Sequence, residues 1–127
     1  MPQLVQVRRE VIDSVLSYSK AFHPDEGILL LKGKNRKGVL TIQEVVIPPL
    51  AEHSENSSSF PMFMLPSDVS IIGVAHSHPN GALFPSEEDL NNFYGRVMVL
   101  VGYPYRSEVD VAVFDRDGKS LVFNVIP

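Results

Sequence analysis

The sequence contains no cysteine among its 127 residues. This absence excludes disulfide bonds, thiolate zinc sites, iron–sulfur clusters and a cysteine nucleophile together. Any metal site must therefore use histidine, aspartate and glutamate side chains. The chain also lacks an apolar run near the ~20 residues that a membrane-spanning helix needs. Its first residues, MPQLVQVRRE, carry charges where the apolar part of a secretion signal would lie, so we expect a cytoplasmic protein with no membrane partner.

An excess of positive charge is lacking as well. Lys and Arg total 11 against 15 Asp and Glu, which gives a formal net charge of −4. A chain with a pI near 5.5 does not have the electrostatic footprint of a nucleic-acid-binding protein, so no nucleic-acid partner is expected. Hydrophobic residues make up 44%, too many for a disordered chain. The length corresponds to one domain over residues 1–127. A domain of this size can bury a stable core without disulfide bonds or structural metal ions.

The pattern of apolar residues predicts two helices and several strands. Apolar residues at helical spacing from Val7 onwards predict a helix over Arg8–Phe22, which Pro24 ends. A shorter helix is predicted over Ser86–Tyr94. The predicted strands are Gly27–Lys32, Val39–Ile47, Phe60–Leu65, Val69–Ala75, Val97–Val101, Val109–Phe114 and Leu121–Ile126. The first two of these strands are expected to form one hairpin, and the last two another. The predicted helices and strands together indicate an α/β (α+β) domain with a mixed sheet.

Two histidines stand two residues apart at the end of a predicted strand. Because side chains alternate along a strand, His76 and His78 are expected to point to the same side of the sheet. Two neutral imidazoles on one side can bind one divalent ion, most often zinc. A His-X-His pair at a strand end also occurs without a metal, so both interpretations stay open.

Residues elsewhere in the chain supply further candidates for such a site. Ser86 and Asp89 have the spacing of a capping box, which starts many helices. In the same geometry, Asp89 can face the strand end as a third metal ligand, and Ser86 can aim its hydroxyl at an oxygen bound to the metal. Glu26 precedes a buried strand, either as a solvated loop residue or as a general base acting on a metal-bound water.

Taken together, these residues resemble the motif of the JAMM (MPN-plus) metalloprotease family. The matching residues are Glu26, His76, Ser77, His78, Pro79, Ser86 and Asp89, with ten residues between His78 and Asp89. The resemblance covers essentially the whole chain and is greatest to the compact archaeal and bacterial members. It implies a curved mixed β-sheet flanked by helices, similar to the fold of the cytidine deaminases.

The resemblance also implies the role of each residue. His76, His78 and Asp89 would bind one Zn²⁺ per chain and leave a fourth position for water. Glu26 would take a proton from that water and later pass it to the leaving amine. Ser86 would hydrogen-bond the oxyanion of the tetrahedral intermediate. Such relatives are zinc isopeptidases that remove ubiquitin or ubiquitin-like modifiers, so the expected partners are a small ubiquitin-like modifier protein and its conjugates.

Three alternatives to this function stay open. The nearest is also hydrolytic, namely C-terminal processing of a sulfur-carrier protein that has the ubiquitin-like fold. The second is an inactive scaffold relative, which keeps the fold to assemble complexes; such relatives lose metal ligands, whereas this sequence keeps them. The third is a role in DNA repair, by analogy with distant bacterial relatives, although the acidic charge argues against direct DNA contact.

The small size of the chain leaves few sources of substrate selectivity. Selectivity must come from its own loops, from a second copy in a homodimer or from another partner. The polar, Ser-rich stretch Glu52–Ser59 either borders the groove for the modifier's extended tail or is a passive exposed loop, and both interpretations stay open. His23 and His53 lie outside the motif and are not expected to be metal ligands.

Overall fold

The computed structural model describes residues 4–47, 52–53, 58–59 and 70–127. In chain order the elements are β1 (Leu4–Arg8), α1 (Arg9–Phe22), β2 (Ile28–Arg36), β3 (Val39–Val46), β4 (Glu52–His53), β5 (Ser58–Ser59), β6 (Ile71–His78), α2 (Glu87–Asn91), β7 (Val97–Gly102), β8 (Val111–Phe114), β9 (Ser120–Leu121) and β10 (Phe123–Ile126). A 3₁₀ turn over Glu108–Asp110 precedes β8. Neither helix of this described part is long and apolar enough to span a bilayer.

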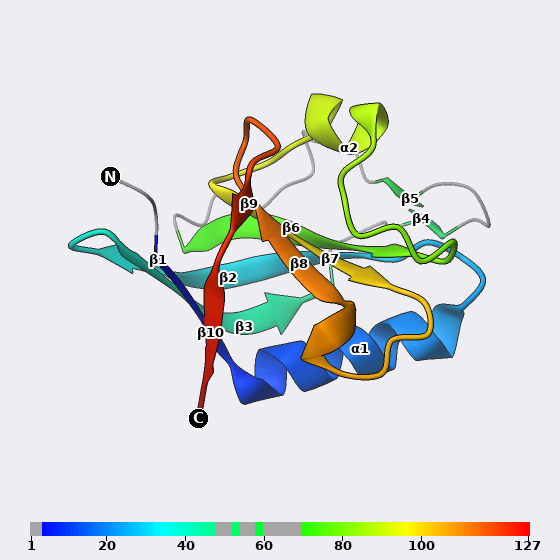
Figure 1. The fold of residues 1–127 in the computed structure, drawn as a ribbon, viewed down its shortest axis with the longest axis horizontal. Helices are drawn as coiled ribbons and strands as arrows, with labels where there is room; N and C mark the ends of the chain where they lie inside the picture. The colour runs from blue at the N-terminus through cyan, green and yellow to red at the C-terminus, as the bar shows by residue number, and fades with distance from the viewer. Residues whose placement is uncertain (1–3, 48–51, 54–57, 60–69) are drawn as a thin grey trace.

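A mixed eight-stranded sheet, ordered β10-β1-β3-β2-β6-β7-β8-β9, forms the centre of the domain. The pairs β10/β1, β1/β3 and β6/β7 are parallel, and the other pairs are antiparallel. Strands β9 and β10 lie at opposite edges of the sheet, yet only Val122 separates them in the chain. The sheet must therefore curl until its two edges meet (Figure 1). The expected curved mixed sheet with two helices is confirmed.

The two helices lie on opposite sides of this sheet (Figure 1). Strand β2 shows how the two sides are built, because its apolar residues alternate between two cores. Leu29 and Leu31 belong to the cluster that packs against α1, whereas Leu30 packs in a second cluster with Phe93, which follows α2. Every residue of β6 and β7 is buried, as expected for central strands covered on both faces.

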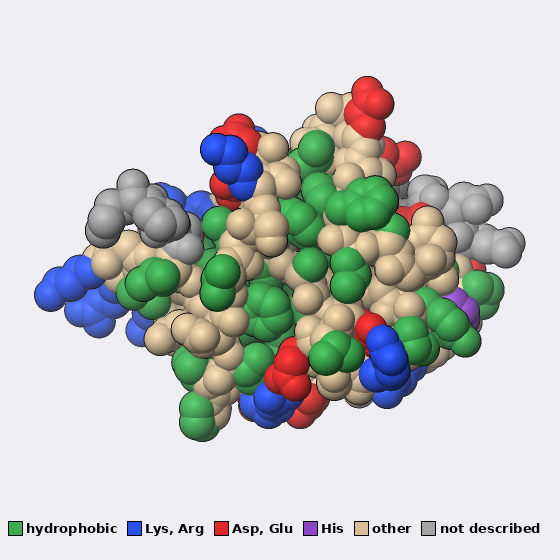
Figure 2. Space-filling model, viewed as in Figure 1, with side chains coloured by type: hydrophobic (Ala, Val, Ile, Leu, Met, Phe, Trp, Pro, Cys, Tyr) green, Lys and Arg blue, Asp and Glu red, His purple; other side chains and the backbone are tan. Residues whose placement is uncertain are grey.

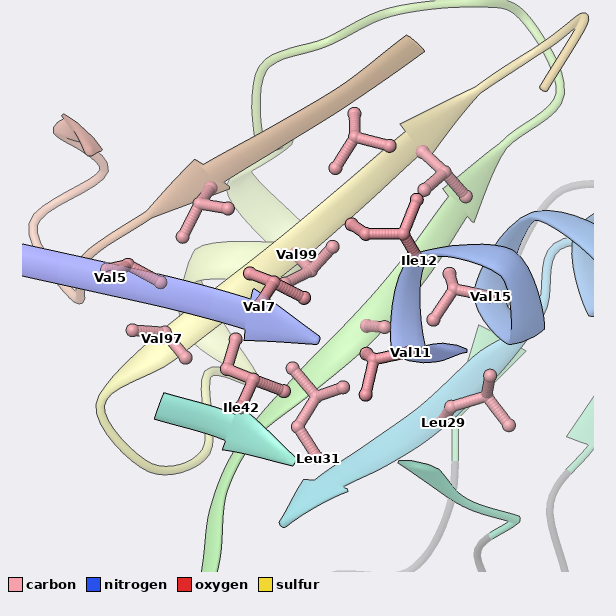
Figure 3. Close-up of a cluster of buried hydrophobic side chains, with 14 of the residues drawn as sticks. Val5, Val7, Val11, Ile12, Val15, Leu29, Leu31, Ile42, Val97 and Val99 are labelled. Atoms are coloured by element: carbon pink, nitrogen blue, oxygen red, sulfur yellow. The ribbon is translucent and has the colours of Figure 1, made fainter. Parts of the chain in front are cut away.

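The larger core lies between α1 and the sheet (Figure 3). From α1, Val11, Ile12 and Val15 point toward the strands, at the spacing that gives a helix one apolar face. Val7 of β1 and Ile42 of β3 meet them from the sheet, and both are 0% exposed. This core holds the central strands in place, and the candidate site lies at the end of one of them.

The structure corrects the prediction at both ends of the chain. The helix predicted over Arg8–Phe22 begins at Arg9, and Val7 belongs to strand β1, which the sequence analysis missed. Val7 stands four residues before Val11, so its spacing also fitted a helix, but its pairing with β3 decides the strand. The first predicted hairpin is confirmed, although its strand β2 runs on to Arg36.

The predicted terminal hairpin is only partly correct. Strand β9 pairs with β8, but β10 crosses to the far edge and pairs with β1, with Val5 opposite Phe123. The predicted helix Ser86–Tyr94 is shorter in the structure and spans Glu87–Asn91. The predicted strand Phe60–Leu65 lies outside the described residues.

An ion pair between the exposed Arg106 and the buried Asp110 shapes the turn between β7 and β8. Asp110 is 5% exposed and accepts two hydrogen bonds from the Arg106 guanidinium, at 3.0 and 2.8 Å, and one from the Arg106 backbone N–H at 2.7 Å. The side-chain hydrogen bonds from Arg106 are the main reason why the pKa of Asp110 falls to about 2. The carboxylate therefore stabilises this turn in its ionised form.

We expect truncation of the larger core to destabilise the fold strongly. Leu31 is 0% exposed, so Leu31→Ala removes buried methyl groups and leaves a cavity. Such changes typically lower the free energy of unfolding by about 2–5 kcal/mol. Val122→Ala, at a position that is 82% exposed, is the control and should change it by less than about 0.5 kcal/mol. Equal effects of the two changes in denaturant titrations would contradict the packing described.

The Arg106–Asp110 pair predicts a pH-dependent contribution to stability. Because the folded pKa of Asp110 lies below the ordinary value of ~3.9, its contribution is complete above about pH 4 and is lost as the pH falls toward 2. Asp110→Asn should therefore lower the melting temperature at pH 7, and the difference from wild type should shrink between pH 4 and pH 2. Asp117→Asn, at an exposed position, controls for the loss of one negative charge. A difference that stays constant across this range would refute the assignment.

Candidate functional site

The two histidines of the motif lie at the end of central strand β6. This strand lies between β2 and β7, with Ile28 opposite His76 and with His78 beside Gly102. His76 and His78 are only 4% and 8% exposed. Their two-residue spacing directs both imidazoles to one face of the sheet, as predicted.

The start of α2 brings a carboxylate to the same place. Ser86 is the N-cap, and its hydroxyl oxygen accepts the N–H of Asp89 at 3.0 Å. In return, Asp89 Oδ2 accepts the N–H of Ser86 at 2.9 Å, which completes a capping box. The predicted capping box is therefore present, and it also turns the buried Asp89 carboxylate toward the end of β6.

The Asp89 carboxylate reaches both imidazoles. Its Oδ2 lies 2.9 Å from Nε2 of His78, and its Oδ1 lies 4.0 Å from Nδ1 of His76. Burial by itself would raise the pKa of Asp89, but the hydrogen bond with His78 and the charge of His76 outweigh burial, and the pKa falls to about 2. Asp89 is therefore a carboxylate at neutral pH, held between two histidines.

The carbonyl of Ala82 determines which nitrogen of His78 faces the site. Nδ1 lies 3.0 Å from this oxygen, which can only accept a hydrogen bond, so Nδ1 carries a proton and donates it. The turn that presents the oxygen is closed by Asn80 Oδ1, which accepts the Ala82 N–H at 2.9 Å. Nε2 is thereby left to face Asp89, as is usual for a metal-binding histidine whose other nitrogen donates to a carbonyl.

His76 is the most unusual polar group of the site. Both of its ring nitrogens are buried, and neither has a hydrogen-bond partner among the described residues. Burial lowers the pKa of His76 to about 4, so the imidazole is neutral at pH 7. A buried, neutral imidazole without a partner is costly unless a ligand binds it.

These residues fit a zinc ion. Two imidazole nitrogens and one carboxylate oxygen are donors that zinc prefers, and three protein ligands leave a position open, as in catalytic sites. Tetrahedral ligands about 2.0–2.1 Å from zinc lie about 3.3 Å apart. The contacts of Asp89 with His78, at 2.9 Å, and with His76, at 4.0 Å, bracket this value. No three such side chains of the described residues already stand in coordination geometry, so binding requires shifts of about half an ångström.

Glu26 lies across a pocket from this group. The pocket has a volume of about 680 Å³, and its lining includes Glu26, His78, Ser86 and Asp89. Burial is the main cause that raises the pKa of Glu26 to about 7; His78 opposes the rise, and Asp89 and Glu88 add to it. A carboxyl group with this pKa can both accept and release a proton near neutral pH.

Acidic residues line and flank the pocket, whereas the tip of the β2–β3 hairpin is basic. Glu87 and Glu88 are exposed on α2, and acidic side chains cover this helix on the face in Figure 2. Lys34, Arg36 and Lys37 are exposed at the tip of the β2–β3 hairpin, and basic side chains gather at that end.

The structure brings all the predicted site residues together and adds contacts that the sequence analysis missed. His23 is not one of the predicted site residues. Its Nδ1 is hydrogen-bonded to the Tyr105 hydroxyl at 3.1 Å, and its ring stacks on Tyr103. The missed contacts, including the Ala82 carbonyl, depend on the folded backbone, and no spacing in the sequence reports them.

Known proteins resemble this chain over nearly all of its length. The Prok-JAB family, the prokaryotic homologues of the JAB domain, matches residues 8–116. A protein named "Probable metalloprotease" from Haloferax volcanii is 32% identical over 124 residues, which cover 92% of this chain and 76% of that protein.

Two solved structures support the same relationship. The crystal structure of a JAB1/MPN domain protein from Archaeoglobus fulgidus has a TM-score of 0.72 at 30% identity and covers 96% of this chain and 99% of that chain. A structure described as JAMM, a metalloprotease-like zinc site in the proteasome and signalosome, has a TM-score of 0.69 at 28% identity and covers 98% of this chain and 100% of that chain. Because the family match extends over most of the chain and includes every residue of the candidate site, this protein belongs to the prokaryotic JAB-domain family, with the JAB/JAMM/MPN fold.

Proposed function

We propose that this protein is a zinc metalloprotease that hydrolyses the bond after the C-terminal tail of a small ubiquitin-like modifier protein. One observation carries the proposal: His76, His78 and Asp89 converge beside a pocket that Glu26 and Ser86 also line or border. The name of the Haloferax relative and the description of the JAMM structure as a metalloprotease-like zinc site support the hydrolytic part.

In this proposal His76, His78 and Asp89 hold one zinc ion per chain. When bound, zinc would polarise a water molecule and bring its pKa toward ~7. His76 offers a neutral nitrogen because burial disfavours its protonation. His78 is oriented by Ala82, and Asp89 by the Ser86 N–H, so the ligands are held before any metal binds.

In this proposal Glu26 transfers the proton, and Ser86 stabilises the negative charge that develops on the carbonyl oxygen. The Glu26 carboxylate accepts a proton from the attacking water and returns it to the leaving amine, and a pKa of about 7 suits both steps. The Ser86 hydroxyl oxygen already accepts the Asp89 N–H, which leaves its proton free to donate to the carbonyl oxygen of the scissile bond.

The lining of the pocket supports a substrate without a free carboxylate at the scissile end. The described lining residues include Glu26, Glu88 and Asp89 but no Lys or Arg. A carboxypeptidase needs a cation for the terminal carboxylate of its substrate, and the described lining offers none. An isopeptide or internal peptide bond, with neutral groups on both sides, suits this charge better.

Metal binding can be tested without a substrate. We expect the metal-free protein to take up one zinc per chain, measured by calorimetry, with a higher melting temperature because zinc binds the folded state. At a free zinc concentration of one hundred times Kd, the stabilisation should be about 2.7 kcal/mol. His76→Ala should abolish both effects, and His23→Ala should keep them. Uptake of zinc by His76→Ala at wild-type affinity would overturn the ligand assignment.

The role of Glu26 predicts a split between metal binding and hydrolysis. Glu26→Gln keeps the shape of the side chain but cannot accept the proton, so kcat should fall about 10²–10⁴-fold with zinc content unchanged. His78→Ala should lose both zinc and activity. Asp25→Asn changes the neighbouring acid, which does not line the pocket, and should stay active. Full activity of Glu26→Gln would refute the proposed base.

The assay for these variants should also separate the two hydrolytic functions. A ubiquitin-like protein joined to a lysine by an isopeptide bond is compared with the same protein bearing a linear C-terminal extension. Faster cleavage of the conjugate supports the proposed isopeptidase, whereas cleavage of the linear extension alone would favour processing of a sulfur-carrier protein.

A further inference from the structure

Glu26 belongs to the connection between two regular elements, where it forms an isolated β-bridge. Helix α1 ends at Phe22 and strand β2 begins at Ile28, so the proposed base lies between them. Its distance from the metal ligands therefore depends on how the flanking backbone is tied to β6. The residue that ties it is Ser77, the member of the His-Ser-His segment that has no part in the proposed chemistry.

Ser77 and Gly27 are joined by two hydrogen bonds. The Ser77 N–H donates to the Gly27 carbonyl at 3.1 Å, which continues the ladder between β2 and β6. In the return direction, the Gly27 N–H donates to the Ser77 hydroxyl oxygen at 2.7 Å. In a regular antiparallel pair of this kind, the acceptor would be the main-chain carbonyl of Ser77. The hydroxyl therefore replaces a backbone acceptor where the chain leaves the ladder and turns toward Glu26.

The surroundings leave this contact little freedom. Ser77 is 2% exposed and Gly27 is buried, so water cannot take the place of the hydroxyl. A Cβ at Gly27 would lie 2.8 Å from the ring of Tyr18 and 3.5 Å from the Ser77 hydroxyl. The backbone beside Glu26 therefore packs close to the Tyr18 ring and the Ser77 hydroxyl, with no room for a side chain at Gly27.

We propose that Ser77 is a positioning residue that sets the distance between Glu26 and the metal ligands on β6. The hydroxyl lies between His76 and His78 in the sequence and bonds the residue next to Glu26, so one side chain links the base to the ligand strand. This inference rests on the proposed function for the role of Glu26, but the bond itself can be tested without it.

The test compares Ser77→Ala with Ser77→Thr, which keeps the hydroxyl. Ser77→Ala should lower kcat about 10–100-fold with KM within twofold, because misplacement of a catalytic group by about 1 Å has effects of this size. Zinc uptake should stay at one per chain, and Ser77→Thr should recover most of kcat. The matched control is Ser19→Ala, whose hydroxyl is equally buried at 2% exposure but bonds the Val15 carbonyl within α1.

A second readout does not depend on activity. In the metal-free protein, Ser77→Ala should speed hydrogen exchange of the Gly27 amide at least tenfold and shift the NMR titration of the Glu26 carboxyl. Ser77→Thr and Ser19→Ala should leave both as in wild type. If Ser77→Ala does not fold, Ser77→Val is compared with Ser77→Thr, since these two side chains share a shape and differ in the hydroxyl.

The outcomes separate this inference from the proposed function. Wild-type kcat and Gly27 exchange in Ser77→Ala, in an enzyme that Glu26→Gln inactivates, would overturn the positioning role and leave the proposed function standing. A wild-type protein that cleaves no conjugate, but whose Gly27 exchange and Glu26 titration respond to Ser77→Ala, would overturn the proposed function and support the positioning role. A fall in kcat of equal size in Ser19→Ala would reduce the effect to general destabilisation and overturn the inference.

Discussion

The carboxylate of Asp89 is the group on which the arrangement of the site depends, because it joins two elements that approach from different parts of the fold. Its Oδ2 accepts the Ser86 N–H and faces Nε2 of His78, both at 2.9 Å. The same oxygen therefore caps α2 and holds the start of this helix against the end of β6. A glutamate would carry the carboxylate one bond further from the backbone, so these two contacts could not both keep their present lengths.

The pKa values of the two histidines are shifted in opposite directions by their different environments. Burial lowers the pKa of His76 to about 4, whereas for His78 the contact with Asp89 outweighs burial and the pKa is raised. His76 thus stays unprotonated at neutral pH chiefly because of desolvation. His78 depends on Asp89 and on the Ala82 carbonyl, which keeps the proton on Nδ1. The negative charge of Asp89 favours a second proton on His78, and it would favour a metal cation in the same way. Metal and proton therefore compete for the same place.

The parts of this structure that the sequence predicts are those that local spacing controls. Period-two geometry places His76 and His78 on one face, and the three-residue spacing of Ser86 and Asp89 makes a capping box; both rules act within a single element. The missed features depend on contacts between distant residues. Val7 fits a helical period as well as a strand, and only pairing with β3 decides between them. The crossing of β10 to Val5 and the bond from Gly27 to Ser77 likewise join segments that no local rule connects.

The site combines two histidines on a central strand with an acid on the connection between α1 and β2, and this division has a physical basis. Both ligand histidines end a strand whose every residue is buried, between two paired neighbours, so their spacing is determined by the sheet. Glu26 is outside any helix or long strand, and its half-buried carboxyl has a pKa of about 7, chiefly because burial disfavours the charged form. Ligands must keep their distances while a metal is bound, whereas a base must reach first a water molecule and then a leaving amine. In the proposed mechanism the nucleophile is a water molecule and not a side chain, so this cysteine-free chain can place the two demands on separate elements.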